Sequence, residues 1–448
     1  MTRVPSPINT FVMPRSISKR YGKLVGGDVS DRLEALMQTR SDPLKEQRQR
    51  QLKLLNELLK HAEDNVPYYK KKYDGVSTTV DSLNKFDEIP PLTKDEVKEY
   101  ADSLVSESHG TSSLHQEFTS GSTGKPLTIY VDDDAAAWQK AHQLRHYRQM
   151  GYEPGDKIAV IWGEGQYFRM KRLRDTVDNL FRNRRELRTF ELSEEEVREY
   201  SRFLSEYDPD IIESYPSAIV LLCEAIEDQG LSVAPKAVQT TSEMLSERER
   251  SYIESVMDAP VYNKFGASEV GPVAMTCAAD DGMHINTESI IVETDDEGRL
   301  LVTNLRNHAM PMIRYRIGDF VDIEDDPDRE ACSCGSRLPT IGEIRGKTND
   351  LVVTTNDTYL DPYFFVDLMD RGPDVETFKI IQNEDRSVEV MIVPDEEPDS
   401  VRNHVTTELA SVDDQLDIKI KFVDTIPKAE GWKRRYIMSE VSEETWNT

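Results

Sequence analysis

One short segment combines hydroxyl groups, glycines and a lysine in a pattern suited to binding an anion. It comprises Thr119, Ser120, Gly121, Ser122, Thr123, Gly124 and Lys125, and Pro126 follows it. The glycines allow the backbone to curl so that several N–H groups point at one anion, and the side chains add further donors. The segment is not a Walker A loop, because that motif requires Gly at position 119 and Ser or Thr at position 126. We therefore predict a loop that binds phosphate groups, followed by a strand over 127–131.

Three of the four cysteines, together with one histidine, have a spacing typical of a zinc site. Cys277 and His284 form one pair of ligands, and Cys332 and Cys334 form the other. Zinc binds cysteine and histidine in such combinations, and structural sites fill all four positions with protein ligands. A chain this long with so few cysteines is not expected to be a disulfide scaffold. We predict a structural Zn²⁺ site, and a core position for Cys223 on an apolar helical stretch.

The elements that must position these residues follow from hydrophobic periodicity. Leucines at helical spacing predict a helix over 44–62, and Asp132–Asp134 before a run of alanines predicts the start of another. A buried strand is predicted over 157–162. Strands of this kind alternate with helices predicted over 197–204, 218–228 and 247–257. This alternation is typical of a layered α/β domain.

The pattern changes in the second half of the chain. Two apolar runs, 290–292 and 300–302, flank an acidic turn with Gly298 and predict a β-hairpin. Farther on, we predict strands over 378–381, 388–393 and 418–423 and a helix over 400–412. The predicted fold is therefore a large multi-layer α/β domain with a β-rich portion, plus a small mobile α+β domain. The predicted divisions are an irregular extension over 1–45, the large domain over 46–348, which includes the zinc region 277–334, and the small domain over 349–448.

The amino-acid composition limits the kinds of binding partner that we expect. The chain has 448 residues, and its 83 acidic against 55 basic residues give a formal net charge of −28. Such a surface repels nucleic acid and anionic lipid, so we expect neither as a partner, and it is typical of a halophilic protein. We find no apolar run of membrane-spanning length and no signal-peptide core, and we expect a cytoplasmic protein. The sequence leaves open whether the chain forms a homodimer.

The sequence resembles the adenylate-forming enzymes over about residues 50–445. It is most similar to the branch that contains phenylacetate–CoA ligases, coenzyme F390 synthetases and CapK-type proteins. The resemblance is carried by the phosphate loop and by further segments, namely 65–69 (Asn-Val-Pro-Tyr-Tyr), 89–94 (Ile-Pro-Pro-Leu-Thr-Lys), 215–217 (Tyr-Pro-Ser) and 240–245 (Thr-Thr-Ser-Glu-Met-Leu). The resemblance implies that residues 119–125 hold the β- and γ-phosphates of ATP.

The resemblance also implies functional roles for two further motifs. The segment from Phe265 and Gly266 to Ser268 and Glu269 resembles the family's Y-G-x-T/S-E motif. There the aromatic ring stacks on adenine, the hydroxyl contacts the α-phosphate and the carboxylate holds Mg²⁺, a hard cation that prefers oxygen ligands. Asp319 ends a Tyr-x-x-Gly-Asp motif whose carboxylate accepts both ribose hydroxyls in the family.

The remaining motifs match with departures. Lys347 stands where the family has arginine, and it keeps the charge but loses the bidentate geometry. Asn349 replaces the usual hinge aspartate, and Trp432 stands where glycine is common. Lys433 takes the position of the catalytic lysine, which stabilises the charge near the α-phosphate.

The resemblance implies an AMP-forming acid–thiol ligase. Such an enzyme activates a carboxylic acid, here phenylacetate-like or another aryl acid, to an acyl-adenylate, forms a thioester with coenzyme A and releases AMP and pyrophosphate. A coenzyme F390 synthetase-like AMP transfer or a CapK-like role in polysaccharide biosynthesis is the alternative. The departures at Lys347, Asn349 and Trp432 keep a third possibility open, a nucleotide-binding module with impaired catalysis. The sequence does not identify the acid.

Overall fold

The computed structural model describes residues 12–14, 16, 27–118, 127–162, 179–180, 182–188, 193–279, 282–324, 330–347, 352–355, 359–360, 362–395, 397–413, 415–426 and 437–439. The chain divides into two compact units. Unit 1 takes up residues 1–245, 250–317 and 322–342, and unit 2 takes up residues 246–249, 318–321 and 343–448. The predicted boundary between residues 348 and 349 lies outside the described residues and stays a prediction.

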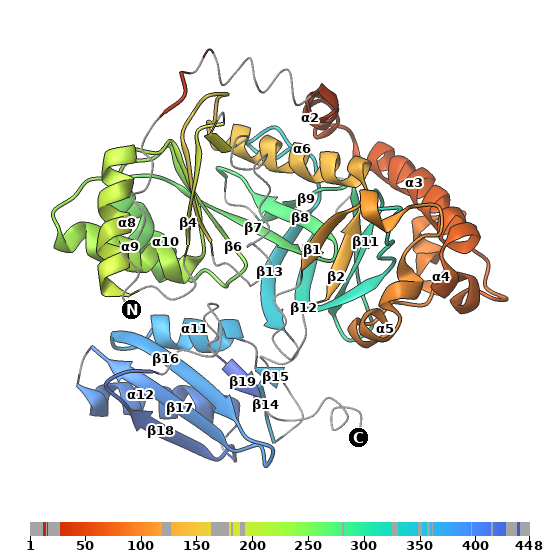
Figure 1. Ribbon diagram of the computed structural model, residues 1–448. Coiled ribbons are helices and arrows are strands. Elements are labelled where there is room, and N and C mark those ends of the chain that lie inside the picture. Colours follow the sequence, from red (N-terminus) through yellow and green to blue (C-terminus); the bar gives the residue numbers. More distant parts are fainter. Residues whose placement is uncertain are drawn as a thin grey trace. The chain divides into compact units, whose positions relative to one another are not determined.

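A large mixed sheet dominates the fold (Figure 1). Within the described ranges, eleven strands follow one another in the order β10-β11-β12-β13-β9-β8-β7-β6-β5-β3-β4. Their bounds are β3 (Ile158–Trp162), β4 (Arg184–Arg188), β5 (Ile211–Ser214), β6 (Ala237–Thr241), β7 (Val261–Ala267), β8 (Gly271–Thr276), β9 (Met283–Ile285), β10 (Ile290–Thr294), β11 (Arg299–Asn304), β12 (Tyr315–Glu324) and β13 (Thr340–Lys347). Together with the helices they confirm the predicted α/β class.

The strands from β4 to β7 form the parallel part of the sheet. The central strands β5 and β6 are buried along their whole length, as expected for strands that are covered on both sides. From Ile158 to Ile161, β3 is buried throughout, which confirms the strand predicted there. The strands from β7 to β9 continue the sheet in antiparallel fashion. The predicted hairpin is confirmed as β10 and β11, with Ile290 opposite Asn304.

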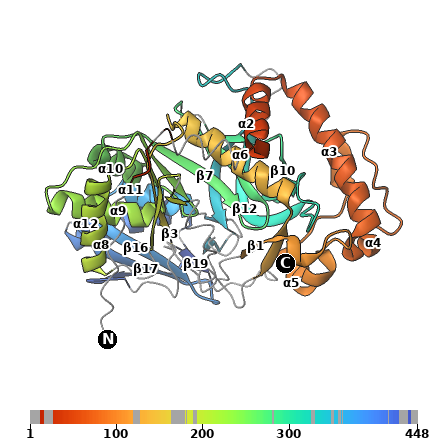
Figure 2. The same cartoon turned by 45° about the horizontal axis from the view of Figure 1, so that its top comes forward.

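Helices cover both faces of the parallel strands (Figures 1 and 2). Unit 1 contains α2 (Gly27–Thr39), α3 (Leu44–Asn65), α4 (Pro67–Lys72), α5 (Lys94–Glu99), α6 (Asp133–Gln149), α8 (Glu194–Tyr207) and α9 (Pro216–Asp228), and α10 (Glu247–Met257) begins at the division between the units. The helices predicted over 44–62, 197–204, 218–228 and 247–257 are confirmed. Right-handed crossovers place α8, α9 and α10 on one face, so α6 covers the other.

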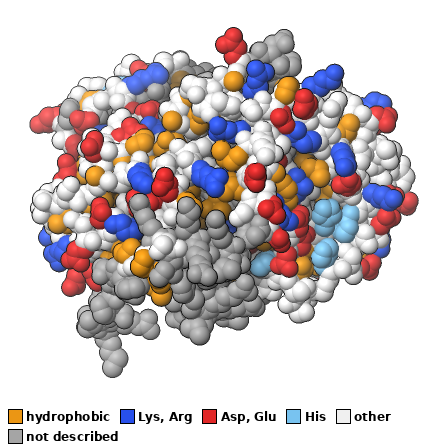
Figure 3. Space-filling model, turned by 90° about the horizontal axis from the view of Figure 1, so that it is seen from above, with side chains coloured by type: hydrophobic (Ala, Val, Ile, Leu, Met, Phe, Trp, Pro, Cys, Tyr) orange, Lys and Arg blue, Asp and Glu red, His pale blue; other side chains and the backbone are white. Residues whose placement is uncertain are grey.

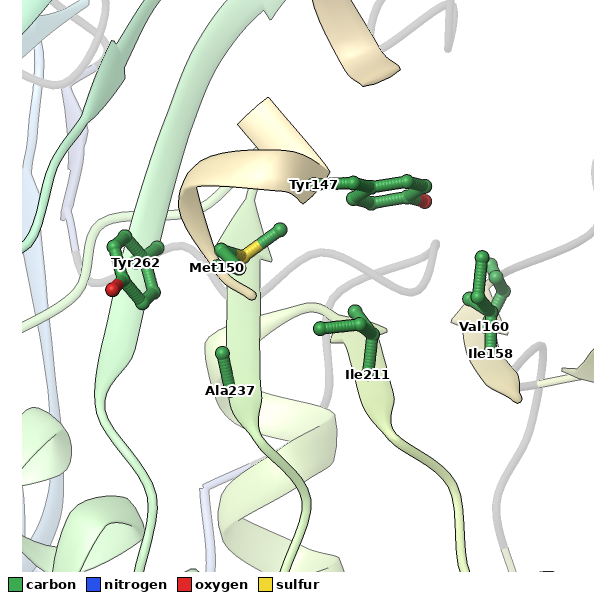
Figure 4. Close-up of a cluster of buried hydrophobic side chains, with 7 residues drawn as sticks. All are labelled: Tyr147, Met150, Ile158, Val160, Ile211, Ala237 and Tyr262. Atoms are coloured by element: carbon green, nitrogen blue, oxygen red, sulfur yellow. The ribbon is translucent and has the colours of Figure 1, made fainter. Parts of the chain in front are cut away.

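Helix α6 is fixed at its start and along its length. The Asp132 side chain accepts a hydrogen bond of 2.8 Å from the backbone of Ala135, which caps the helix and confirms the predicted start. The helix packs on the sheet through a buried apolar cluster, which Figure 4 shows, formed by Tyr147, Met150, Ile158, Val160, Ile211, Ala237 and Tyr262. Within the predicted irregular extension, α2 packs Leu33 and Leu36 against Ala141 of α6. This apolar face accounts for an ordered helix there.

A two-stranded antiparallel ribbon flanks the predicted phosphate loop. Strands β1 (His115–Phe118) and β2 (Thr128–Val131) pair with each other, and Phe118 lies opposite Thr128. Residues 119–126 between them lie outside the described residues. The strand predicted over 127–131 is confirmed as β2.

Unit 2 contains a smaller sheet with its own helices. Its elements are β14 (Val352–Val353), β15 (Tyr359–Leu360), α11 (Pro362–Asp370), β16 (Val375–Gln382), β17 (Val388–Pro394), α12 (Pro398–Val412), β18 (Ile418–Phe422) and β19 (Ile437–Ser439). Four of the strands pair in the order β18-β17-β16-β19 among the described residues. Buried Val401, Val405 and Leu409 line one side of α12. The strands and the helix predicted for this part of the chain are confirmed.

Two surface properties bear on function. Acidic and basic side chains are interspersed on the face that Figure 3 shows. Within the described residues, none of the helices combines the length and the apolar composition needed to cross a membrane.

Candidate functional site

The turn that joins β7 to β8 carries the residues predicted to contact adenine and magnesium. Phe265 lies near the end of β7, and Ser268 and Glu269 lie in the turn, all partly buried. The two strands approach unusually closely here, because a Cβ atom on Gly266 would lie 2.6 Å from the carbonyl oxygen of Gly271. Glycine at position 266 is therefore required by the close approach of the two backbones.

Glu269 is tied to the beginning of β12. The hydroxyl of Tyr315 donates a hydrogen bond of 3.1 Å to Oε1 of Glu269. Tyr315 is buried and is the first residue of the Tyr-x-x-Gly-Asp motif. Glu269, the candidate magnesium ligand, therefore lies next to Tyr315. This tyrosine begins the motif that ends at Asp319, the candidate ribose ligand.

Two segments of the resemblance fix the backbone around Tyr315. The Leu92 N–H donates to the carbonyl of Arg314, and the Arg316 N–H donates to the carbonyl of Leu92, so Leu92 pairs with Tyr315 in parallel fashion. In the earlier segment, the hydroxyl of Tyr69 donates a 2.9 Å hydrogen bond to the carbonyl of Pro311. Both segments therefore hold the chain as it enters β12.

Glu117 is a candidate functional residue that sequence reasoning missed. It lies on β1, two residues before Thr119. Burial, followed by the negative charge of Glu269, raises the pKa of Glu117 to about 7. A cation bound at Glu269 would relieve this repulsion. The only signal in the sequence is the position of Glu117 directly ahead of the predicted phosphate loop.

Two further predicted site residues lie on strands of the sheet, and the others lie outside the described residues. Asp319 is buried on β12 and belongs to the part of that strand counted in unit 2. Lys347 is the last residue of β13, and the structure describes its backbone only. The loop 119–125, Asn349, Trp432 and Lys433 lie outside the described residues. Their roles stay predictions.

The predicted zinc ligands come together in unit 1. One ligand atom from each of Cys277, His284, Cys332 and Cys334 lies within 4.8 Å of the others. The Sγ atoms of Cys277 and Cys332 are 3.6 Å apart, and Sγ of Cys334 is 3.4 Å from Nε2 of His284. Three sulfurs and one imidazole nitrogen converge on one point, a donor set that suits tetrahedral zinc.

The local backbone orients these four side chains. Nδ1 of His284 is 3.3 Å from the carbonyl of Leu338, and an N–H at Nδ1 would leave the lone pair of Nε2 directed at the sulfurs. The Gly335 N–H donates to the carbonyl of Cys332 in a tight turn that brings both cysteines of this pair to the same side. A hydrogen bond with Cys334, followed by burial, raises the pKa of Cys277 to about 11, and the same bond lowers the pKa of Cys334.

Known proteins resemble the chain in sequence and in structure. The CapK C-terminal domain family matches residues 352–440. Protein CapK of Staphylococcus aureus is 24% identical over 390 residues, which cover 83% of each chain. The phenylacetate–coenzyme A ligase of Pseudomonas putida is 26% identical over 337 residues, covering 68% of this chain and 72% of the ligase.

The fold is also that of a solved ligase. A crystal structure of 2-hydroxyisobutyryl-CoA ligase in the postadenylation state superimposes with a TM-score of 0.73 at 19% identity, covering 90% of this chain and 91% of the ligase. The predicted kinship is confirmed: the chain is a homologue of the phenylacetate–coenzyme A ligases and of CapK, and it has the fold of the adenylate-forming enzymes.

Proposed function

We propose that the chain is an ATP-dependent, AMP-forming acid–coenzyme A ligase. The relatives named as coenzyme A ligases and the shared fold support this reaction class. The single observation that carries the proposal to the site is the hydrogen bond between Tyr315 and Glu269, because it joins the two nucleotide motifs that lie within the described residues.

The reaction has two balanced steps. An oxygen of the substrate carboxylate attacks the α-phosphorus of ATP, the bond to the bridging oxygen of the β-phosphate breaks, and pyrophosphate leaves with the electron pair of that bond. The thiol of coenzyme A gives up its proton to solvent, its sulfur attacks the acyl carbonyl, and AMP leaves with the electron pair of the broken acyl–oxygen bond. Positioning and charge stabilisation account for most of the rate in phosphoryl-type transfers.

The residues receive these roles in the proposal. Phe265 stacks on adenine, Ser268 contacts the α-phosphate and Asp319 accepts the ribose hydroxyls. Tyr315 engages one carboxylate oxygen of Glu269, so the second can face a cation. Carboxylate oxygens suit Mg²⁺, which when bound would neutralise phosphate charge.

Predicted site residues that lie outside the described residues complete the proposal. The loop 119–125 holds the β- and γ-phosphates, and Lys433 stabilises the charge that develops near the α-phosphate. Between the two steps, the small C-terminal domain turns about Asn349, with Lys347 beside the hinge. This lid-type motion would withdraw the lysine and admit the thiol.

A structural zinc site is the second part of the proposal. The geometry of Cys277, His284, Cys332 and Cys334 supports it, since all four ligand atoms converge and His284 has a carbonyl partner for its other nitrogen. Zinc would tie the end of β8 and the strand β9 to the loop that precedes β13. All four positions are filled by protein, as expected for a site without a catalytic role.

CapK-like action in surface-polysaccharide biosynthesis is the second candidate function. It is favoured by the CapK relative, which spans more of the chain than the Pseudomonas ligase does, and by the match of unit 2 to the CapK C-terminal domain. In either case we propose a cytoplasmic protein that acts on small molecules.

The test is a pyrophosphate-release assay with ATP, magnesium, coenzyme A and a panel of aryl and aliphatic acids at low and at molar salt. We expect pyrophosphate, AMP and an acyl-CoA thioester with at least one acid. Glu269→Gln keeps the shape and removes the magnesium ligand, and it should lower the rate by about 100-fold or more. Glu297→Gln, in the exposed β10–β11 turn, is the matched control. Lys433→Ala should abolish adenylation.

The outcomes separate the alternatives. Pyrophosphate without consumption of coenzyme A would replace thioester formation by AMP transfer to another acceptor, as in the coenzyme F390 synthetase-like reading. Binding of ATP without pyrophosphate from any acid would leave a nucleotide-binding module and overturn the ligase proposal.

A further inference from the structure

An ion pair between a buried carboxylate and a partly buried lysine lies near the carboxyl ends of the parallel strands, and the function proposed above does not use it. The Nζ atom of Lys264, on β7, is 2.7 Å from Oε1 of Glu213, on β5. Helix α6 adds two partners. The hydroxyl of Tyr147 donates a 2.6 Å hydrogen bond to Oε2 of Glu213, and Oε1 of Gln143 accepts a 3.1 Å bond from Lys264.

The register of the sheet places this pair on the face covered by α6. Glu213 lies beside Val160 and Gln239 in one row across the strands, and Lys264 lies two residues farther along, opposite Thr241 and therefore on the same face. The amino-terminal side of the same face is the apolar cluster shown in Figure 4. The face therefore changes from apolar to polar towards the carboxyl ends of the strands, which is where open α/β sheets bind their ligands.

Lys264 also directly precedes Phe265, the residue proposed to stack on adenine. An acid that attacks the α-phosphate must lie beside the nucleotide. The carbon skeleton of that acid therefore has to be accommodated close to the carboxyl end of β7.

Structural bracing alone is a weak explanation for the ion pair. Removing two charges from water costs several kcal/mol per ion, and apolar replacements of buried ion pairs are often neutral or stabilising. Two residues closer to the amino ends of the strands, the same face of the sheet packs with apolar side chains. Moreover, the Lys264 side chain remains 17% exposed, whereas Glu213 is 6% exposed, so the lysine is the more accessible member of the pair.

The charges at this position are balanced. Burial raises the pKa of Glu213, but the charges of Lys264 and Arg184 and the bonds from Lys264 and Tyr147 outweigh it and bring the pKa to about 2. Arg184 is also 3.6 Å from Glu186. Among the described residues, two cations thus face two carboxylates, and this group carries no excess positive charge that would attract a further carboxylate of a ligand.

The ammonium group of Lys264 still has donor capacity. It carries three N–H donors, and Glu213 and Gln143 accept two of them. A ligand with a neutral oxygen would satisfy the third without upsetting the charge balance. A hydrocarbon skeleton would instead leave a desolvated N–H group without a partner, which is costly.

We propose that Lys264 is a specificity-determining residue that selects acids carrying a hydroxyl or carbonyl oxygen over hydrocarbon acids of the same size. This inference rests on the proposed ligase function. It makes an unsubstituted aryl acid such as phenylacetate a poor substrate.

The experiment compares matched acids that differ by a single hydroxyl group. Pyrophosphate release is measured with phenylacetate against mandelate and 4-hydroxyphenylacetate, and with butyrate against 3-hydroxybutyrate, for the full-length protein. We expect kcat/KM for at least one hydroxylated acid to exceed that of its partner by about tenfold or more, because sites built around a polar group discriminate strongly.

The variants assign the preference to the ion pair. Lys264→Met keeps the length of the side chain but leaves Glu213 unpaired, so it is combined with Glu213→Gln in a double variant that carries neither charge. We expect the double variant to bring the ratio of kcat/KM values close to one by lowering the rate with the hydroxylated acid, while pyrophosphate still forms.

The matched control removes a comparable ion pair at the amino-terminal ends of the parallel strands. Lys236 lies just before β6, with Nζ 2.6 Å from the fully buried Asp156. Lys236→Met with Asp156→Asn should leave the ratio unchanged, and thermal unfolding verifies that each variant is folded.

Two results overturn the proposal in distinguishable ways. If pyrophosphate forms but the wild type shows no preference for an oxygen-bearing acid, or if the Lys264 double variant keeps the preference, the specificity role is wrong and the ligase function stands. If the wild type forms no pyrophosphate with any acid, the ligase function fails, and the specificity role fails with it.

Discussion

The close contact between β7 and β8 leads to a prediction that joins stability to activity. In Gly266→Ala, the new Cβ would lie 2.6 Å from the carbonyl oxygen of Gly271 and 3.1 Å from Cα of Pro272. Both neighbours are backbone atoms, so no side-chain rotation can relieve the contact. The strands must separate, and the turn with Glu269 must move with them.

The magnitude follows from these distances. Carbon–oxygen contacts between strands normally lie at about 3.3–3.6 Å, so β7 and β8 must shift apart by about 0.7 Å. Overpacking of this kind costs about 1–3 kcal/mol, and we expect a value near the upper end because the backbone itself has to move. A misplacement approaching 1 Å costs roughly 100-fold in rate, so kcat/KM for pyrophosphate release should fall about 10- to 100-fold.

The assay pairs urea unfolding with pyrophosphate release. Gly110→Ala is the matched control, because a Cβ there has no heavy atom within 4 Å and the backbone has no positive φ. The control should change the free energy of unfolding by less than about 0.5 kcal/mol and retain full activity. If Gly266→Ala unfolds and reacts like the control, the close approach of the two strands does not position Glu269, and our account of the turn is wrong.

Three further predictions concern other parts of the molecule. Tyr315→Phe removes the hydrogen bond to Glu269, and the magnesium concentration for half-maximal pyrophosphate release should rise about 2- to 10-fold, as expected for one lost hydrogen bond; an unchanged magnesium titration would contradict this role. Cys334→Ser should lower the bound zinc measured by elemental analysis and the unfolding temperature, and a wild type that binds no zinc from a stoichiometric solution would refute the site. For Glu96, burial opposes ionisation, but hydrogen bonds, the largest from Lys72, lower its pKa to about 2. Its stabilisation is therefore present above pH 4.5 and lost as the pH falls towards 2, by about 1–2 kcal/mol after a discount for a side chain 32% exposed. In Glu96→Gln the free energy of unfolding should depend less on pH across this window in acid titrations, and an unchanged slope would show that the ion pair contributes nothing.

Local chemistry made much of the fold predictable. The strand Ile158–Trp162 could be predicted because both of its faces are buried and its residues are accordingly apolar throughout. The start of α6 could be predicted because Asp132 caps it through a neighbour three residues away. The four cysteine and histidine positions could be grouped because each pair is close in sequence and zinc restricts the ligand types.

Contacts between distant segments were not predictable in the same way. The bond from Tyr315 to Glu269 joins residues 46 positions apart, and the pair Lys264–Glu213 joins residues 51 positions apart. Neither residue type is unusual at its position, and only the strand order brings them together. Glu117 likewise becomes notable only when its burial and the nearby charge of Glu269 are known.

The segments that open the resemblance act at a distance from the chemistry. Tyr69 holds the carbonyl of Pro311, and Leu92 pairs with both neighbours of Tyr315. Arg314 adopts a left-handed backbone with φ of 48°, and its guanidinium donates to the carbonyl of Ile89. A non-glycine residue in this conformation is maintained only where its surroundings enforce it. These contacts therefore fix the direction in which the chain enters β12, and with it the position of the hydroxyl that engages Glu269. The opening segments thus act on the position of Glu269 through the backbone around Tyr315, 46 residues farther along the chain.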